Sequence, residues 1–419
     1  MAKYIIIWWG PAWSALWNFL LKNWVTDVTI IEKETFWRHH IGESMQPDVF
    51  NIFSQLWIDI DLLEKAFPKK YGAVYKWGKY KDKWTVLYSK ELDDKWNKNE
   101  EIENLQWYEY GYNVDRSIFD KILLDNFLLK WWKLITQKVV WINVSKETNN
   151  NHIDNLVLQD GSHIVADFYI DATWQDSLFS SFFKLKKFDT YLRNSTIYGY
   201  YKGFLGLDKT LGKDFQFIEN VWDAWYWWIP ISYDIVSVWI VYNTQKKFLD
   251  NDFFEFVKQS EIYESIKNAE LVDPDGNPTT KLRYISDWSF LSETAYWDNW
   301  FLVWDAFWFV DPILSWGASF AMEKAIYLWK ILILIDRLPG RKSELCNRYE
   351  SDYKKDVLDY LKMAYLWYQN WNSKGQWLDE TWGTKLGFVD YISWGKRFLY
   401  QQKIFQDWQN DKISSQLFE

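Results

Sequence analysis

The chain has 419 residues, enough for one large domain or two to three interleaved ones with an ample core. Its formal net charge is −9, and no basic stripe lies beside the aromatic residues, which argues against a nucleic-acid surface. Cys346 is the single cysteine and the four histidines lack zinc-ligand spacing, so we expect no disulfide, no oxidising compartment and no metal site.

The first segment of the chain is apolar. Residues 4–21 carry no charge and, taken alone, have the composition of a transmembrane helix or a signal peptide. Pro11 within this segment and the single Lys3 before it argue against both. We therefore expect a cytoplasmic protein that does not contact a membrane.

The elements expected along the chain begin with an alternation of strand and helix. Residues 3–7 and 27–32 have the pattern of buried strands, and residues 11–23 between them have that of a helix, which together predict a βαβ unit. The later expected elements are a helix at 115–131, strands at 133–144 and 155–159, a strand at 168–171 that returns to the first sheet, a second sheet within 188–245, and helices from 319 onward. We therefore predict an α/β fold whose two sheets are interleaved in the sequence.

The turn after the first strand has an unusual composition. Residues 8–13 are WWGPAW, which fits the dinucleotide-binding pattern G-x-G-x-x-G if both outer tryptophans stand for glycine. In that pattern a pyrophosphate binds at the helix N-terminus, and an acid that closes the second strand binds a ribose 2′-OH, as in FAD. The alternatives are a coincidental aromatic turn and a solvated strand end. The candidate cofactor-binding residues of this unit are Trp8, Gly10, Ala12, Trp13 and Glu32.

Tryptophan is in excess throughout the chain, with 33 Trp against 17 Gly, whereas about 7% of an ordinary chain is Gly. Two explanations remain open. In one, the protein is a non-catalytic, Trp-rich binding protein whose rings form core or a stacking surface. In the other, a codon that means Gly in the source was read as Trp. We favour the second, and we interpret the Trp at positions 8, 13, 174, 304, 308 and 316 as Gly.

The segment after the second strand gives the first specific resemblance. Residues 36–44, FWRHHIGES, resemble the corresponding segment of flavin-dependent halogenases, which belong to the FAD-dependent monooxygenase superfamily. Without the resemblance, Arg38 and the two histidines after it would be only a cationic loop. The resemblance implies that the residues of this segment that lie against the cofactor are Arg38, Ile41, Glu43 and Ser44.

Three further segments are similar to the superfamily in the same order. Residues 114–120 resemble the Asp-Arg helix start, in which Arg116 would reach the cofactor, although Asp115 is also a good N-cap. Residues 171–174, DATW, resemble Asp-Ala-Thr-Gly beside the dinucleotide. Residues 304–306, WDA, resemble Gly-Asp-Ala, in which Asp305 would hold a hydroxyl of FAD.

Two motifs narrow the resemblance to halogenases. Residues 225–230, WYWWIP, fit the signature W-x-W-x-I-P, whose alternative interpretation is an apolar strand. Residues 309–317, FVDPILSWG, fit F-x-x-P-x-x-S-x-G, in which Trp316 and Gly317 would hold the halide through a nest of backbone N–H groups. Its alternative is a loop that enters a helix. The signature residues are Trp225, Trp227, Ile229 and Pro230.

A lysine motif supplies the candidate catalytic residue. Residues 67–73, FPKKYGA, resemble F-x-x-K-x-G-A, and the resemblance implies that Lys70 receives hypohalous acid and presents it to the substrate. A lysine suits this role because its ammonium can hydrogen-bond a neutral oxidant. Most lysines are solvated surface charges, and Lys69 fits that description.

One departure bears on the substrate. Halogenases of free tryptophan carry Glu immediately before the Ser of the halide motif, where this chain has Leu314. The resemblance therefore implies a phenol, a pyrrole or a carrier-bound aromatic acyl group. Reduced FAD from a separate flavin reductase, O₂ and a halide ion would complete the reaction. The rival is a monooxygenase or oxidoreductase of the same superfamily that uses no halide.

The resemblance covers about residues 3–335 and implies a Rossmann-like FAD-binding domain with an interleaved antiparallel-sheet substrate domain. We expect the first part of the FAD-binding domain at 1–180, with a substrate-side insertion at about 60–110, the substrate-domain sheet at 181–288, a return of the FAD-binding domain at 289–335 and a helical C-terminal region at 336–419.

Overall fold

The structure is a computed structural model in which residues 2–7, 10, 27–34, 39–47, 49–56, 58–77, 83–88, 109–128, 133–145, 151–207, 212–221, 224–245, 248–286, 289–315 and 317–369 are described. The helix expected at 11–23 and the site residues Trp8, Ala12, Trp13, Arg38 and Trp316 lie outside these residues. Within the described part of the chain, no helix has both the length and the apolar character needed to cross a bilayer.

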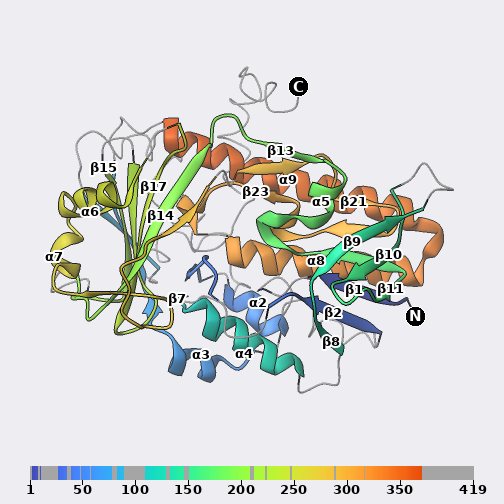
Figure 1. Cartoon of the computed structure of the whole chain (residues 1–419), viewed down its shortest axis with the longest axis horizontal. Helices are drawn as coiled ribbons and strands as arrows, with labels where there is room; N and C mark the ends of the chain where they lie inside the picture. The colour runs from blue at the N-terminus through green and yellow to red at the C-terminus, as the bar shows by residue number, and fades with distance from the viewer. Residues whose placement is uncertain are drawn as a thin grey trace, which may run out of the picture.

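A six-stranded, mostly parallel sheet forms one half of the molecule (Figure 1). Its central strand has the sequence YIII and is buried along its whole length, as expected for a strand covered on both faces. This strand pairs in parallel with the second expected strand and with the strand that returns to it, so the expected parallel sheet is confirmed. The strands in spatial order are β21 (Tyr296–Trp297), β22 (Trp300–Leu302), β12 (Phe168–Asp171), β1 (Tyr4–Ile7), β2 (Val28–Glu32) and β8 (Lys133–Thr136).

The single strand expected at 133–144 is wrong, because the structure contains two strands in different sheets. β8 ends at Thr136, and β9 (Val139–Val144) pairs with β10 (Ile153–Leu158), which pairs with β11 (His163–Ile164). Gln137 lies at the break, where its side-chain amide donates to Asp160 at 2.7 Å and accepts from the Asp160 backbone N–H at 3.2 Å. These bonds turn the chain out of the parallel sheet.

An eight-stranded sheet forms the other half, and its central strands are buried on both faces. Helices α6 (Asp250–Lys258) and α7 (Tyr263–Ile266) lie on its outer side (Figure 1). The other face carries a cluster of aromatic side chains and is directed toward the site. The strands are β18 (Glu270–Val272), β14 (Asn194–Lys202), β17 (Ile235–Asn243), β16 (Ala224–Pro230), β15 (Phe215–Val221), β5 (Gly72–Lys76) and β6 (Lys83–Leu87), with β19 (Arg283–Ile285) paired to β14.

Two long helices follow the last strands, so the expected helical C-terminal region is confirmed as far as residue 369. Together with the two sheets they confirm the predicted α/β fold. The helices are α2 (Val49–Leu56), α3 (Ile60–Ala66), α4 (Arg116–Leu128), α5 (Leu178–Phe182), α8 (Gly317–Arg337) and α9 (Lys342–Gln369), and the 3₁₀ turns are η2 (Trp174–Asp176), η3 (Trp304–Ala306), η4 (Pro312–Leu314) and η5 (Pro339–Arg341). Two small sheets complete the fold: β3 (Ser44–Met45), β7 (Gly111–Asn113) and β4 (Lys69–Lys70), and β13 (Lys186–Phe188), β20 (Phe290–Ser292) and β23 (Trp308–Phe309).

Candidate active site

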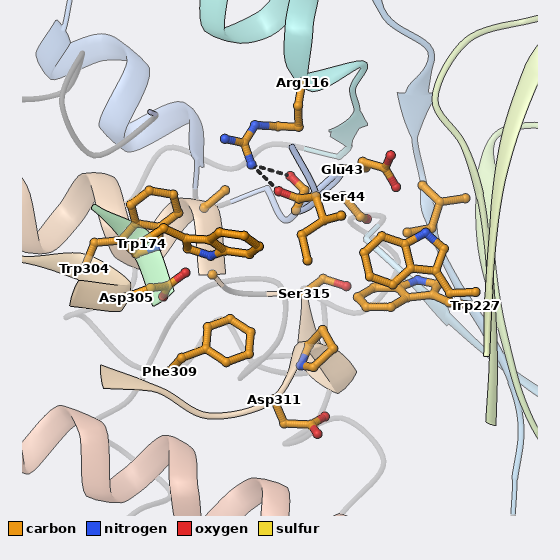
Figure 2. Close-up of a pocket in the computed structure, with 17 residues that line it drawn as sticks. Glu43, Ser44, Arg116, Trp174, Trp227, Trp304, Asp305, Phe309, Asp311 and Ser315 are labelled. Carbon is orange, nitrogen blue, oxygen red and sulfur yellow. Dashed lines mark hydrogen bonds between the residues drawn. The ribbon is translucent and has the colours of Figure 1, made fainter. Parts of the chain in front are cut away.

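A cavity lies where the two large sheets approach each other, and its walls come from segments far apart in the sequence (Figure 2). Eight of the expected site residues line it, so folding brings together most of the motifs that lie within the described residues. These eight are Ile41, Glu43, Ser44, Arg116, Trp227, Ile229, Asp305 and Gly317.

The segment at 41–44 is fixed by Arg116, the first residue of α4. Its guanidinium Nη1 donates to the carbonyl of Ile41 and lies 3.5 Å from that of Gly42 (Figure 2). Its Nε and Nη2 donate to the two carboxylate oxygens of Asp120 at 3.0 and 3.1 Å. Gly42 has φ +95°, and a Cβ there would lie 2.8 Å from Arg116 Nη1, so this turn requires glycine. Arg116 therefore positions the backbone of the cavity wall.

Glu43 is a buried carboxylic acid on this wall. Tyr200 of β14 donates its hydroxyl to Glu43 Oε1 at 2.8 Å. Burial raises the pKa of Glu43 to about 7, although hydrogen bonds from Ser237 and Tyr200 and the charge of Arg116 act in the opposite direction. Glu43 can therefore exchange a proton near neutral pH.

Asp311 is a second carboxyl group at the cavity, and it is half-buried. It accepts hydrogen bonds from Asn194 Nδ2 at 2.9 Å, from the backbone N–H of Ile313 at 3.0 Å and from the Tyr368 hydroxyl at 3.1 Å. Burial raises its pKa to about 6, with these hydrogen bonds opposing the rise. The Tyr368 hydroxyl in turn accepts from Trp225 Nε1 at 2.9 Å, so α9 connects the signature strand to this carboxyl group.

Asp305 lies in η3, directly after the parallel strand β22, and its side chain is buried at the cavity. Burial raises its pKa well above the ordinary value, while a hydrogen bond from Trp174 and the charge of Arg116 lower it. A buried acid at the carboxyl end of a parallel strand suits a bound hydroxyl group, because ligands of such sheets bind at that edge.

The spacing of the signature residues follows from the strand on which they lie, β16. All seven of its residues are buried, and successive side chains of a strand point to opposite faces. Trp225, Trp227 and Ile229 belong to the aromatic cluster on the site face, whereas Tyr226 and Trp228 pack toward α6 and α7. Pro230 ends the strand and does not line the cavity. The signature thus lies on an apolar strand, so the alternative interpretation of these residues as an apolar strand is also correct.

The loop before α8 forms one wall of the cavity and contributes Asp311 and Ser315 to it (Figure 2). Ser315 has φ +57° and follows η4, whose first turn is capped by Asp311. Gly317 is the first residue of the 21-residue helix α8 and lines the cavity. The free backbone N–H groups at the start of a helix make this end a suitable place for an anion.

Lys70 does not line this cavity, but its strand β4 belongs to the small sheet that also contains Ser44 of the cavity wall. It is fully buried in β4 and pairs with Gly111 of β7, which also pairs with β3. A Cβ at Gly111 would lie 2.2 Å from the Met45 carbonyl oxygen, so only glycine lets these strands approach. Lys70 Nζ donates to Gln46 Oε1 at 3.3 Å and lies 5.4 Å from the centre of the Tyr88 ring. The neighbouring Lys69 is partly exposed and pairs with Glu64, as expected for a surface lysine.

The remaining described residues of the dinucleotide unit are buried but separate from the cavity wall. Gly10 lies in a bend after β1, and Glu32 ends β2 with Oε1 accepting from the backbone N–H of Glu34 at 2.9 Å. Asp115 caps α4 by accepting from the Ser117 backbone N–H at 2.8 Å, so its N-cap interpretation is confirmed.

Sequence reasoning missed the neutral side chains that connect the motifs. Gln216 Oε1 accepts from Ser44 Oγ at 2.6 Å and from Ser315 Oγ at 3.4 Å, and so bridges two walls of the cavity. Gln46 is bonded to Lys70 and to the Tyr88 hydroxyl. Both glutamines lie in short apolar strands or their ends, where no motif marks them.

The walls fit a flavin nucleotide in their chemistry but not in their volume. Buried Arg116, Asp305 and the start of α8 offer the charges and donors that a dinucleotide needs. The cavity, however, measures about 60 Å³, against about 300–1,000 Å³ for ligand pockets in general. The indole rings of Trp174 and Trp304 occupy the space opposite Trp227 (Figure 2). Within the described residues, no group of three or more metal-ligating side chains is found.

Comparison with known proteins agrees with these features. The sequence model of the Tryptophan halogenase family matches residues 92–191. The 1H-pyrrole-2-carbonyl-[peptidyl-carrier protein] chlorinase of Pseudomonas fluorescens is 29% identical over 87% of this chain and 83% of the relative. The tryptophan 2-halogenase of Chondromyces crocatus is 25% identical over 77% of this chain, which spans 59% of that relative's length.

A solved structure has the same fold. A triple mutant of the flavin-dependent brominase Bmp2 superposes with a TM-score of 0.79 and 20% identity, and the match covers 100% of both chains. The relatives and the solved structure named above are thus flavin-dependent halogenases, which are FAD-dependent oxidoreductases.

Proposed function

We propose that this protein is an FAD-dependent halogenase that transfers a halogen to an electron-rich aromatic carbon by way of Lys70. The observation that carries the proposal is the burial of Lys70 in the small sheet whose Ser44 lines a cavity built from the flavin, signature and halide motifs. When bound, FAD reduced by a separate reductase would supply, with O₂, the two-electron oxidation of chloride or bromide to hypohalous acid.

The flavin nucleotide would be held by groups that the two sheets already place. Gly10 and Glu32 would hold the pyrophosphate and ribose, and Asp305 a hydroxyl group. Ile41, Glu43 and Ser44 would lie against the flavin, on the backbone that Arg116 fixes. The rest of the expected cofactor set, Trp8, Ala12, Trp13 and Arg38, lies outside the described residues.

The halide would bind at the N-terminus of α8. Gly317 and the preceding position 316 would donate their backbone N–H groups, as the resemblance implies. Gln216, which accepts from Ser315 and Ser44, would keep this loop against the 41–44 segment.

Lys70 would direct the oxidant. Its ammonium would donate a hydrogen bond to the oxygen of hypohalous acid, and the aromatic carbon would attack the halogen. The carbon–halogen bond forms as the oxygen–halogen bond breaks, the oxygen leaves as water with a proton from the ammonium, and the ring proton restores the ammonium. The Gln46 amide and the Tyr88 ring would hold the ammonium without neutralising it.

The substrate class that we propose is a phenol, a pyrrole or a carrier-bound aromatic acyl group. Leu314 occupies the position before Ser315 where halogenases of free tryptophan carry Glu. The chlorinase relative named above acts on a carrier-bound pyrrole, which agrees with this class.

The test uses the glycine form of the chain, in which positions 8, 13, 174, 304 and 316 carry Gly and Trp308, which lies in strand β23, is kept. This protein is supplied with reduced FAD, O₂, chloride or bromide, and a panel of phenols and pyrroles. We expect products whose mass shift depends on the halide. Lys70→Met should abolish them while hypohalous acid escapes and is captured by dimedone. Hydroxylated products that form without halide would instead identify a monooxygenase and refute the proposal.

A further inference from the structure

We infer that positions 174 and 304 are glycine positions of the cofactor cavity, and that the form of this protein which binds FAD carries Gly at both. The claim that both positions are glycine positions rests on backbone geometry. The claim that FAD binding requires Gly there rests on the proposed function. Two independent observations support it.

The first observation is the backbone conformation. Trp174 has φ +52° and Trp304 has φ +60°, in the left-handed region where the Cβ of an L-residue crowds the following carbonyl. Among the residues that the structure describes, no other tryptophan has a positive φ. Both residues begin a 3₁₀ turn shortly after a strand of the parallel sheet: one residue separates Trp304 from β22, and two separate Trp174 from β12. The fold therefore makes the same tight turn twice, and this turn favours glycine.

The second observation is the location of the two rings. Trp174 and Trp304 both line the small cavity that also contains Arg116 and Asp305 (Figure 2). Trp304 is 5% exposed, yet its indole Nε1 has no hydrogen-bond partner. A buried N–H without a partner is unfavourable, and Trp normally finds one when buried. The ring thus fills the space without being matched to it.

The backbone conformation separates these two residues from the other described tryptophans, because Trp227 is also 5% exposed with an indole Nε1 that has no hydrogen-bond partner. Trp227 lines the same cavity but lies in the middle of β16 with an ordinary strand backbone, packed against Trp225 and Trp239. Trp308 lies in β23 and packs against Phe320 and Tyr360, so its backbone gives no reason to replace it with glycine. The structure therefore separates two positions from the general excess of Trp.

The glycine part is tested by unfolding in urea, in the chain as written. Trp304→Gly is compared with Trp304→Ala, and Trp174→Gly with Trp174→Ala, since each pair removes the ring and differs only in the Cβ. We expect each Gly variant to have a folding equilibrium constant about two- to tenfold larger than its Ala counterpart, because relief of positive φ outweighs the greater freedom of unfolded glycine.

The matched control is Trp227→Gly against Trp227→Ala. In a strand interior the order reverses, and Ala should be favoured over Gly by about two- to fivefold. Ala that equals or exceeds Gly at both 174 and 304 would overturn the inference.

The FAD part is tested by titration with FAD, followed by quenching of flavin fluorescence. The glycine form is compared with the same chain that keeps Trp at 174 and 304. We expect the glycine form to bind at least a hundredfold more tightly, because the rings occupy the cavity. Equal, measurable affinity would overturn the inference. If neither chain binds FAD, the proposed function fails, and the unfolding comparison alone decides the glycine assignment.

Peptide mass spectrometry of the protein isolated from its source gives a direct answer. Peptides that contain positions 174 and 304 should have the mass of Gly at both positions. The mass of Trp at either position would refute the inference.

Discussion

The contact between Gln46 and Lys70 permits a quantitative test that needs no cofactor. Gln46 Oε1 accepts from the Lys70 ammonium at 3.3 Å, and all three partners, Gln46, Lys70 and Tyr88, are buried. A hydrogen bond to a charged group contributes about 1.5–3 kcal/mol. Because 3.3 Å is long for such a bond, we expect a coupling at the lower end, about 1.5 kcal/mol.

The measurement is a double-mutant cycle. The free energy of unfolding is determined in urea for the parental chain, Gln46→Leu, Lys70→Met and the double variant. Gln46→Leu should cost about 1.5–3 kcal/mol, because the ammonium loses one of its acceptors in a buried place. The double variant should be more stable than the sum of the single effects predicts, by the coupling energy. Additivity within about 0.5 kcal/mol would refute the interaction.

The same variants separate the structural role of Gln46 from its effect on the reaction. In the glycine form, Gln46→Leu should lower the yield of halogenated product and raise the captured hypohalous acid. It should have no further effect once Lys70 is Met, since Gln46 acts through Lys70. An equal loss of product in both backgrounds would show that Gln46 acts elsewhere.

Three further predictions concern the cavity walls. Burial raises the pKa of Glu43 from 4.5 to about 7, so the free energy of unfolding of the parental chain falls by up to about 3 kcal/mol as the pH rises from below 4.5 to above 7. The Glu43→Gln variant has no such loss, because glutamine does not ionise. Urea unfolding at pH 4 and pH 8 should therefore show the relative stability of the variant rising with pH, and a difference independent of pH would contradict the burial of Glu43. Tyr368→Phe should cost about 1–3 kcal/mol, because the buried Trp225 Nε1 loses its acceptor and Asp311 loses a donor; the thermal midpoint checks this, and an unchanged midpoint would exclude the contact. Gly42→Ala should destabilise the chain by about 1 kcal/mol more than Gly161→Ala, since both have positive φ but only Gly42 faces Arg116 Nη1; equal losses in urea would refute the close approach.

The elements that could be predicted from the sequence are those whose signal is local. The apolar strand YIII, its parallel partner and the returning strand each carry their own pattern, and all three pair as expected. The W-x-W-x-I spacing likewise matches the two-residue period of a strand, which places its three key side chains on one face.

The parts that could not be predicted depend on partners distant in the sequence. Glu43 and Tyr200 are 157 positions apart, so nothing near Glu43 indicates that its pKa is raised. Gln216 connects Ser44 with Ser315 across 172 and 99 positions, and a glutamine in a strand has no motif of its own. The break at Gln137 was missed because the bonds that turn the chain come from Asp160.

Helix α9 has a consequence for how the two halves of the molecule are held in register. Four tyrosines along this helix donate hydrogen bonds to other parts of the chain. Tyr349 donates to the Leu302 carbonyl at the end of strand β22, and Tyr353 to the Trp304 carbonyl in the cavity wall. Tyr365 donates to Asp189, and Tyr368 to Asp311. A tyrosine side chain is too rigid to keep its hydrogen bond if the helix slides, so these bonds fix the position of α9 relative to both halves of the molecule. A shift of α9 by one helical turn would break all four hydrogen bonds together. The distance between the edge of the parallel sheet and the aromatic face of the eight-stranded sheet therefore depends on all four bonds at once.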